Sequence, residues 1–178
     1  MSVVMAVLRL VIGVLFVGHG AQKLFGAFGG PGPEGTGQFF EQVGLRPGKP
    51  KAIAAGATEI VGGALLALGL ATPAAVAMLS GVQYAAIWKV HADKGPWVMG
   101  GGWEYNAVLL ASLMAVAGVG PGALSLDRAL AIERAGLGWA LAATGAGAVG
   151  AAAVALVPPG QAGEAPAQEA EGQEAAAT

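Results

Sequence analysis

Two ionisable residues fall inside long apolar stretches, and they are the first candidates for chemistry in this sequence. Arg9 lies in the middle of an apolar run over residues 3–20, and Glu59 lies inside a second run over residues 52–70. A charge within a membrane span is costly, so such residues are functional-site hypotheses by default. Counting about 1.5 Å per helical residue puts both at a similar depth. The sequence therefore predicts an Arg9–Glu59 ion pair near the bilayer midplane, serving either as a lock on helix register or as a substrate or proton site.

A second group of polar residues collects where three of the apolar stretches begin or end. His19, Gln22 and Lys23 have the i, i+3, i+4 spacing that places side chains on one face of a helix. Glu104 opens another stretch, where its charge also suits the dipole of a helix N-terminus. The candidate polar site is predicted to comprise Arg9, His19, Gln22, Lys23, Glu59, Lys89, His91, Glu104 and Asn106.

The same residues include possible ligands for a metal or a haem. His19 and His91 stand on different predicted helices, as a bis-histidine haem would require, but both lie at helix ends without an obvious haem pocket. A zinc ion would need more ligands than two histidines and scattered carboxylates supply. The chain has no cysteine, which excludes disulfides, thiolate chemistry and Cys-ligated iron–sulfur centres within it. We expect no metal site and no cofactor within the chain itself.

The composition indicates what kind of element positions these residues. The chain is 55% hydrophobic and 11% charged, whereas soluble domains carry about 25% charged residues. Its mean hydropathy is +0.64. The 31 glycines suit helices that approach closely in lipid. No basic run is present, so nucleic-acid binding is not expected. The composition predicts an integral membrane protein with the lipid bilayer as its solvent.

Five apolar stretches are long enough, or nearly so, to cross a bilayer as helices, which takes about 20 residues. Arg9 within the first stretch favours a first transmembrane helix over a cleaved signal peptide. Between the first two stretches lies a Gly- and Pro-rich loop with a short amphipathic helix around residues 36–43, which is either a lid or a connector. A charged segment from Ser125 to Arg134 is expected at the membrane interface. The five stretches cover residues 3–20, 52–70, 74–90, 104–119 and 137–157.

The distribution of lysine and arginine among the loops predicts the orientation of the chain, because cytoplasmic loops are enriched in both. The face with the second and fourth loops has only Arg128 and Arg134. The first and third loops are therefore predicted to be cytoplasmic and the N-terminus to lie outside. With five spans the acidic tail over residues 158–178, which is expected to be disordered, is cytoplasmic too. The basic residues of the first and third loops are Lys23, Arg46, Lys49, Lys51, Lys89 and Lys94.

An ordered set of short motifs resembles the DoxX family over residues 1 to about 130. The resemblance implies a four-helix integral protein of bacterial and archaeal cytoplasmic membranes. It places Arg9, His19, Lys23, Glu59, His91 and Glu104 on positions of the family pattern, without assigning them catalytic roles. The expected fold class is all-α: a transmembrane four-helix bundle over residues 1–130, with a fifth C-terminal transmembrane helix over residues 131–157. The motifs are Leu8–Leu10, His19–Gly26, Thr58–Gly63, Leu68–Pro73, Val90–His91, Gly101–Asn106 and Gly120–Asp127.

The resemblance also implies an association with redox chemistry. The family takes its name from a subunit associated with thiosulfate:quinone oxidoreduction, and other members are described as oxidoreductases or as partners in redox-stress complexes. The expected function is therefore a multi-pass membrane subunit of the bacterial cytoplasmic membrane that binds quinone or passes reducing equivalents with a redox partner protein. Two alternatives stay open: a small-molecule or proton carrier that uses Arg9 and Glu59, and a non-enzymatic membrane scaffold. The sequence does not choose among the three.

Overall fold

The computed structural model describes residues 2–156, and every regular element in this part of the chain is a helix. The expected all-α fold class is therefore confirmed. One-turn 3₁₀ helices occupy Ala27–Gly29, Ala92–Lys94 and Val98–Gly100, and a π-helical turn at Ile87–His91 continues the fourth helix. The α-helices are α1 (Ser2–Phe25), α2 (Gly32–Gln42), α3 (Gly48–Leu68), α4 (Thr72–Ala86), α5 (Glu104–Val119), α6 (Leu126–Ala129) and α7 (Leu137–Leu156).

A helix lies at each of the five apolar stretches predicted from the sequence. Two boundaries differ in a way that matters for the site: α1 continues to Phe25, and α3 begins at Gly48 rather than near Ala52. Among the described residues α1, α3 and α7 are long and apolar enough to cross a membrane, and α5 is a shorter apolar helix. Helix α2 lies at the amphipathic helix predicted around residues 36–43. Helix α6 lies within the charged segment from Ser125 to Arg134, for which an interfacial position was predicted. The predicted disordered tail lies outside the described residues.

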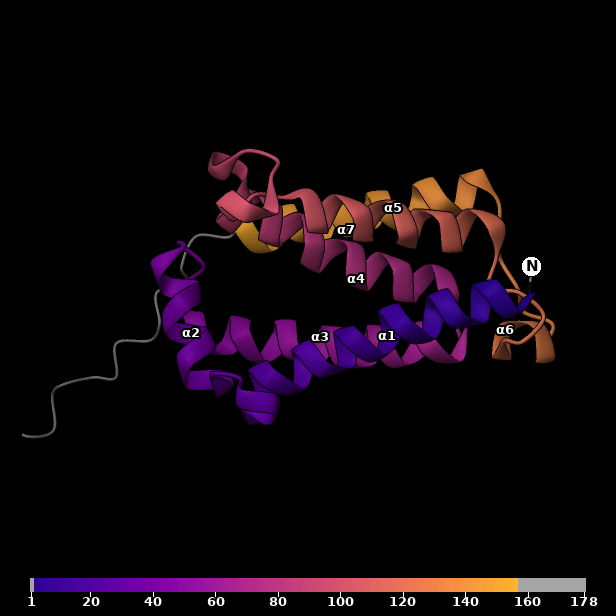
Figure 1. The fold of residues 1–178 in the computed structure, drawn as a ribbon, viewed down its shortest axis with the longest axis horizontal. Coiled ribbons are helices and arrows are strands. Elements are labelled where there is room, and N and C mark those ends of the chain that lie inside the picture. The colour runs from indigo at the N-terminus through magenta and orange to yellow at the C-terminus, as the bar shows by residue number, and fades with distance from the viewer. Residues whose placement is uncertain (1, 157–178) are drawn as a thin grey trace, which may run out of the picture.

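The helices form two layers that diverge toward one end of the molecule (Figure 1). In one layer α1 packs along α3, and in the other α7 packs along α4 and α5. Contacts between α3 and α4 join the two layers. Figure 1 shows the layers close together at the end that holds the start of α1 and α6, and farther apart at the end that holds α2.

Glycines let α1 and α3 approach with their backbones nearly in contact. A Cβ atom added to Gly13 would lie 2.5 Å from the carbonyl oxygen of Gly63, and one added to Gly20 would lie 2.5 Å from that of Gly56. Close approach of this kind is how helices gain packing energy in lipid, where no hydrophobic force acts between them. These two contacts fix the antiparallel register of α1 on α3.

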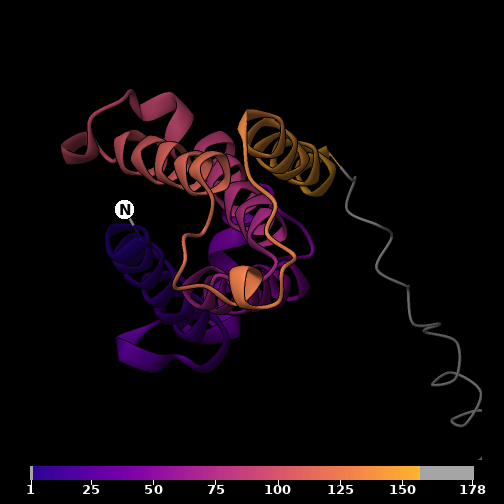
Figure 2. The same cartoon turned by 90° about the vertical axis from the view of Figure 1, so that its right-hand side faces the viewer.

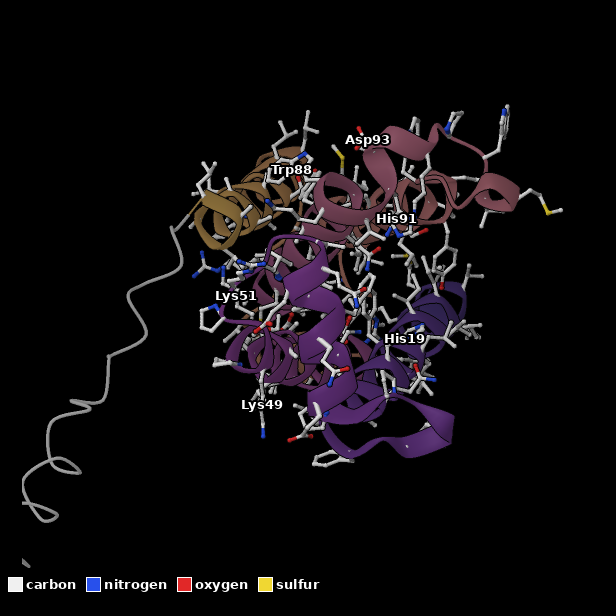
Figure 3. The ribbon with its side chains drawn as sticks, turned by 90° about the vertical axis from the view of Figure 1, so that its left-hand side faces the viewer. His19, Lys49, Lys51, Trp88, His91 and Asp93 are labelled. Carbon is white, nitrogen blue, oxygen red and sulfur yellow. The ribbon has the colours of Figure 1, made fainter. Side chains whose placement is uncertain are left out.

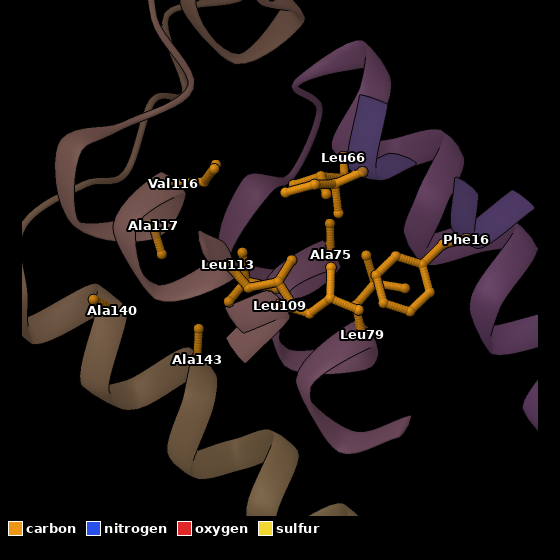
Figure 4. Close-up of a cluster of buried hydrophobic side chains, with 12 residues drawn as sticks. Phe16, Leu66, Ala75, Leu79, Leu109, Leu113, Val116, Ala117, Ala140 and Ala143 are labelled. Atoms are coloured by element: carbon orange, nitrogen blue, oxygen red, sulfur yellow. The ribbon is translucent and has the colours of Figure 1, made fainter. Parts of the chain in front are cut away.

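The hydrophobic core lies between the layers where they are close (Figure 4). Leu66 of α3 meets Val76 and Leu79 of α4 and Leu113 of α5, and all four side chains are fully buried. Phe16 of α1 and Leu109 of α5 form the edge of this cluster toward the end that holds α2. Because the layers diverge beyond that edge, these two side chains also line an open cavity.

Helix α2 crosses the wide end of the α1–α3 layer and packs mainly on α3 (Figure 1). Gly37 of α2 rests so closely on α3 that an added Cβ would lie 2.8 Å from the backbone of Lys49. An exposed ion pair between Glu34 and Lys49 supports the same contact. The Lys49 ammonium beside Glu34 lowers the pKa of that carboxyl below its ordinary value.

Candidate functional site

Glu59 forms its ion pair with Lys23, so the predicted Arg9–Glu59 pair is wrong. The Lys23 Nζ atom donates to both carboxylate oxygens of Glu59, at 2.9 and 2.7 Å. The Glu59 side chain is only 4% exposed, whereas that of Lys23 is 22% exposed. The pair therefore joins α1 to α3 with its acid buried and its base near the surface.

The direction of helical side chains explains this choice of partner. Arg9 lies level with Ala67 on α3, eight residues or about 12 Å along the helix from Glu59. Side chains on a helix tilt toward its N-terminus. Arg9 therefore points toward the start of α1, away from Glu59, while Lys23 points back toward Glu59. Glu59 in turn tilts toward the start of α3, where Lys23 lies.

Arg9 instead closes the narrow end of the bundle by binding main-chain carbonyl groups. Its Nη1 atom donates to the carbonyl oxygens of Leu66 and Ala67, at 3.2 and 3.1 Å, and its Nη2 atom donates to that of Leu124 at 2.6 Å. The last carbonyls of a helix have no partner within it, and a guanidinium is well shaped to bind several at once. Arg9 is 1% exposed, although a shallow hollow of about 540 Å³ lies beside it.

Asp127 completes the same end and was missing from the candidate residues. Its two carboxylate oxygens accept from the backbone N–H groups of Ala71 and Thr72, at 2.7 and 2.9 Å. Its own N–H donates to the carbonyl of Gly69 at 2.8 Å. Figure 2 shows the segment with α6 brought across this end of the helices. Arg9 and Asp127 thus bind the end of α3, the start of α4 and the α6 segment together, and we name this arrangement the Arg9 clamp.

A cavity of about 930 Å³ occupies the wide end, where the two layers diverge. All of the long helices contribute to its walls, and Phe39 and Phe40 of α2 cover part of its end. Most of the lining is apolar, from small residues of α3 and α7 and larger ones of α1 and α5. Ligand cavities for small molecules are of this size and are mainly apolar with a few polar groups.

Polar side chains gather on one side of this cavity, and we name them the polar chamber. The Asn106 Nδ2 atom donates to the Gln83 Oε1 atom at 2.7 Å, which joins α5 to α4. Figure 3 views this end and shows His19 on the α1 side and His91 on the α4 side. The polar chamber comprises His19, Lys23, Glu59, Gln83, His91 and Asn106.

The hydrogen bond of His91 indicates which ring nitrogen carries its proton. The Nδ1 atom lies 2.6 Å from the carbonyl oxygen of Gly101, which can only accept, so Nδ1 must be the donor. In the neutral ring the Nε2 atom then bears a lone pair. His91 sits on the π-helical turn after α4, a type of irregularity that is frequent at functional sites.

Six of the nine predicted site residues line the cavity, and three do not. The Gln22 Oε1 atom accepts from the His19 Nδ1 atom at the surface, at 3.1 Å. Glu104 accepts from the N–H of Val98 at 2.8 Å and holds the loop before α5. Arg9 lies at the opposite end. The six that line it are His19, Lys23, Glu59, Lys89, His91 and Asn106.

Gln83 and Lys51 line the cavity wall but are not among the candidate residues predicted from the sequence. Gln83 is polar but uncharged, although an amide within an apolar helix is itself a signal for a buried polar contact. Lys51 was assigned to a loop because the second apolar stretch was predicted to begin at residue 52, whereas α3 begins at Gly48. No group of three or more His, Cys, Asp or Glu side chains suited to a metal ion occurs within residues 2–156.

The fold and the cavity define a class: a multi-pass helical membrane protein with a large, mainly apolar cavity at one end of its bundle. The family model for DoxX matches residues 4–92, half of the 178 residues. The chain belongs to the DoxX family. The match includes α1 to α4 and ends before the Gly101–Asn106 and Gly120–Asp127 motifs. Comparison with curated proteins and with solved structures gave no match.

Proposed function

We propose that this protein binds a lipid-soluble quinone in the wide-end cavity, as the membrane subunit of a redox system in a bacterial cytoplasmic membrane. The observation that carries the proposal is a largely apolar cavity of about 930 Å³ with the Lys23–Glu59 pair in its wall. An apolar ring with two polar oxygens fits such a chamber better than a fully polar solute does. Family membership supports the redox context.

The polar chamber has the donors that an oxidised quinone needs. A quinone carbonyl only accepts hydrogen bonds. The Lys23 ammonium has three N–H groups, of which two are directed to Glu59, so one remains. The Asn106 amide has two, of which one is directed to Gln83. Each can donate to a carbonyl oxygen of a bound ring.

The same chamber has acceptors for the reduced form. A quinol carries two hydroxyl groups, which must donate. Glu59 and His91 both line the cavity, and the carboxylate of Glu59 and the Nε2 atom of a neutral His91 ring can accept. A chamber with both kinds of group can hold either redox form and exchange protons with it. The electrons would pass to or from a partner protein, because the residues of the chamber have no redox chemistry of their own.

The closed inner end of the cavity favours binding over transport. Phe16 and Leu109 line the cavity and also belong to the packed core. Beyond them Leu113 and Val116 are fully buried, so the core separates the cavity from the narrow end. A carrier built on Arg9 and Glu59 would need a path between two residues that lie on opposite sides of this core.

Binding of decylubiquinone to the purified protein in lipid nanodiscs tests the proposal. Asn106→Leu removes a donor of the chamber and should weaken binding at least tenfold. Gln42→Leu likewise replaces an amide with leucine, at an exposed residue outside the cavity, and should leave binding unchanged. Equal binding by wild type and both variants, or no saturable binding by wild type, would contradict the proposal. Flux of a solute into proteoliposomes without an electron acceptor would favour the carrier instead.

A further inference from the structure

The walls of the wide-end cavity differ in chemistry from one side to the other. The side between α1 and α5 has polar and large side chains, among them His19, Lys23 and Tyr105. The side between α3 and α7 has only small or aliphatic side chains until Lys51 at its end. We name this second side the α3–α7 seam; its residues are Ala54, Ala55 and Thr58 of α3 and Ala146, Gly150 and Ala153 of α7.

The seam is open because α7 packs on α4 and α5 and not along α3. Four of its residues, Ala54, Ala146, Gly150 and Ala153, line the cavity and are exposed. In the described part of the chain one hydrogen bond crosses it, from the Lys51 Nζ atom to the carbonyl oxygen of Val154 at 2.9 Å. Figure 3 shows Lys51 close to the end of α7.

Two glycines of α7 show where space remains. A Cβ added to Gly147 would lie 2.7 Å from the carbonyl oxygen of Ala77, so this face of α7 is packed on α4. A Cβ added to Gly150 would meet nothing within 4 Å. Since Gly150 lines the cavity and is exposed, the space beside it is open. Helices α3 and α7 do not pack along each other there, and in a membrane the surroundings of the bundle are hydrocarbon.

We propose that the α3–α7 seam holds the hydrophobic tail of the bound ligand, which enters sideways from the bilayer with its ring leading into the polar chamber. This rests on the proposed function and specifies its ligand as an amphiphile with one long apolar chain. The small side chains of the seam leave room for a chain and offer it mainly apolar contacts, because the one hydroxyl among them, that of Thr58, donates to the carbonyl oxygen of Ala54 at 2.8 Å. The polar side of the cavity offers the ring its hydrogen bonds, so the two ends of such a molecule have separate places.

A matched pair of variants tests the seam. Gly150→Leu fills it, whereas Gly145→Leu adds the same side chain at an exposed glycine of α7 that does not line the cavity and whose added Cβ also meets nothing. Gly150→Leu should weaken decylubiquinone binding at least tenfold, and Gly145→Leu should not change it. A tailless ubiquinone ring should bind both variants equally. Similar decylubiquinone affinity in the two variants would overturn the seam.

A ubiquinone analogue with a photoreactive diazirine at the end of its tail gives an independent readout. Crosslinks to α3 and α7 support the seam, and crosslinks confined to α1 and α5 overturn it while leaving quinone binding intact. If wild type binds no quinone, the proposed function fails, and native mass spectrometry of co-purified amphiphiles decides the seam separately. Loss of a bound amphiphile only in Gly150→Leu would still support a tail site in the α3–α7 seam. Retention of the amphiphile in that variant, or its absence from wild type, would overturn the tail site.

Discussion

The two ends of the helical bundle each have a buried charge, and the partners of these charges differ. At the narrow end Arg9 donates to three main-chain carbonyl groups and lies near Asp127, whose oxygens accept from two backbone N–H groups. At the wide end Glu59 binds the Lys23 side chain and faces a cavity. Main-chain partners hold the fold together, whereas a side-chain pair beside open space can exchange partners with a ligand.

This contrast separates structural from functional roles among residues that look alike in the sequence. Both Arg9 and Glu59 are ionisable residues in apolar helices, and both are almost fully buried. What distinguishes them is the number of bonds that a ligand would have to break. Displacing Arg9 would leave helix-end carbonyls without donors in a lipid environment, where each unsatisfied group costs several kcal/mol by rough estimate. Displacing one Lys23 contact leaves a second contact to Glu59 in place.

The largest effect is expected from breaking the Arg9 clamp. Arg9→Leu leaves the carbonyls of Leu66, Ala67 and Leu124 without their donor and Asp127 without a nearby positive charge. We expect a loss of at least about 3 kcal/mol in stability, comparable to breaking a buried ion pair. Thermal unfolding in detergent, followed by size-exclusion chromatography, measures this. A variant that is as stable as wild type would show that the clamp does not hold the fold.

A double-mutant cycle sharpens the same comparison. Arg9 and Glu59 are separated by about 12 Å along the helices, a distance at which substitutions without shared partners normally add. Arg9→Leu combined with Glu59→Gln should therefore lower stability by the sum of the two single effects. Recovery of stability in the double variant would mean that the two residues meet in the membrane, against the arrangement described above.

An intermediate and asymmetric effect is expected at the Lys23–Glu59 pair. Lys23→Met strands a carboxylate that is 4% exposed, and a charge in a membrane span costs about 2.5–3.5 kcal/mol on insertion scales. Glu59→Gln leaves an oxygen that still accepts from Lys23, and the long Lys23 side chain can reach the interface. We expect Lys23→Met to lower the unfolding temperature clearly more than Glu59→Gln does. Equal losses would show that Lys23 is as buried as its partner.

Much of the fold could be predicted from the sequence, because a helix that crosses a lipid bilayer must be long and apolar. A helix needs about 20 apolar residues to span, so the five stretches and their order were visible in the hydropathy alone. The tight link at Ala71–Pro73 is likewise typical of antiparallel neighbouring helices, and α3 and α4 pack on each other. The helix boundaries were predicted less accurately, because the polar residues at the end of α1 and at the start of α3 are typical of loops.

The sequence predicted where the candidate site lies, but not which of its side chains bond to one another. Spacing put His19 and Lys23 on one helix face, and the structure brings both to the cavity. The partner of Glu59 could have been found from the tilt of helical side chains, which favours Lys23 over Arg9. The role of Asp127 could not, because it depends on a segment that folds across the helix ends from 55 residues away along the chain.

The smallest effect is expected at the exposed Glu34–Lys49 pair, which gives the comparison its reference point. Exposed ion pairs contribute little, because water screens them and two long side chains must be held in place. Beside Lys49 the pKa of Glu34 lies below its ordinary value, so its contribution is present above the unfolded-state pKa and is lost as the pH falls through the lowered folded-state pKa. Glu34→Gln should therefore unfold almost as wild type does at neutral pH, and any difference should disappear in acid. Thermal unfolding of both proteins across that pH range measures it, with Lys49→Gln as the control. A loss as large as that from Lys23→Met would mean that burial is not what separates the two pairs.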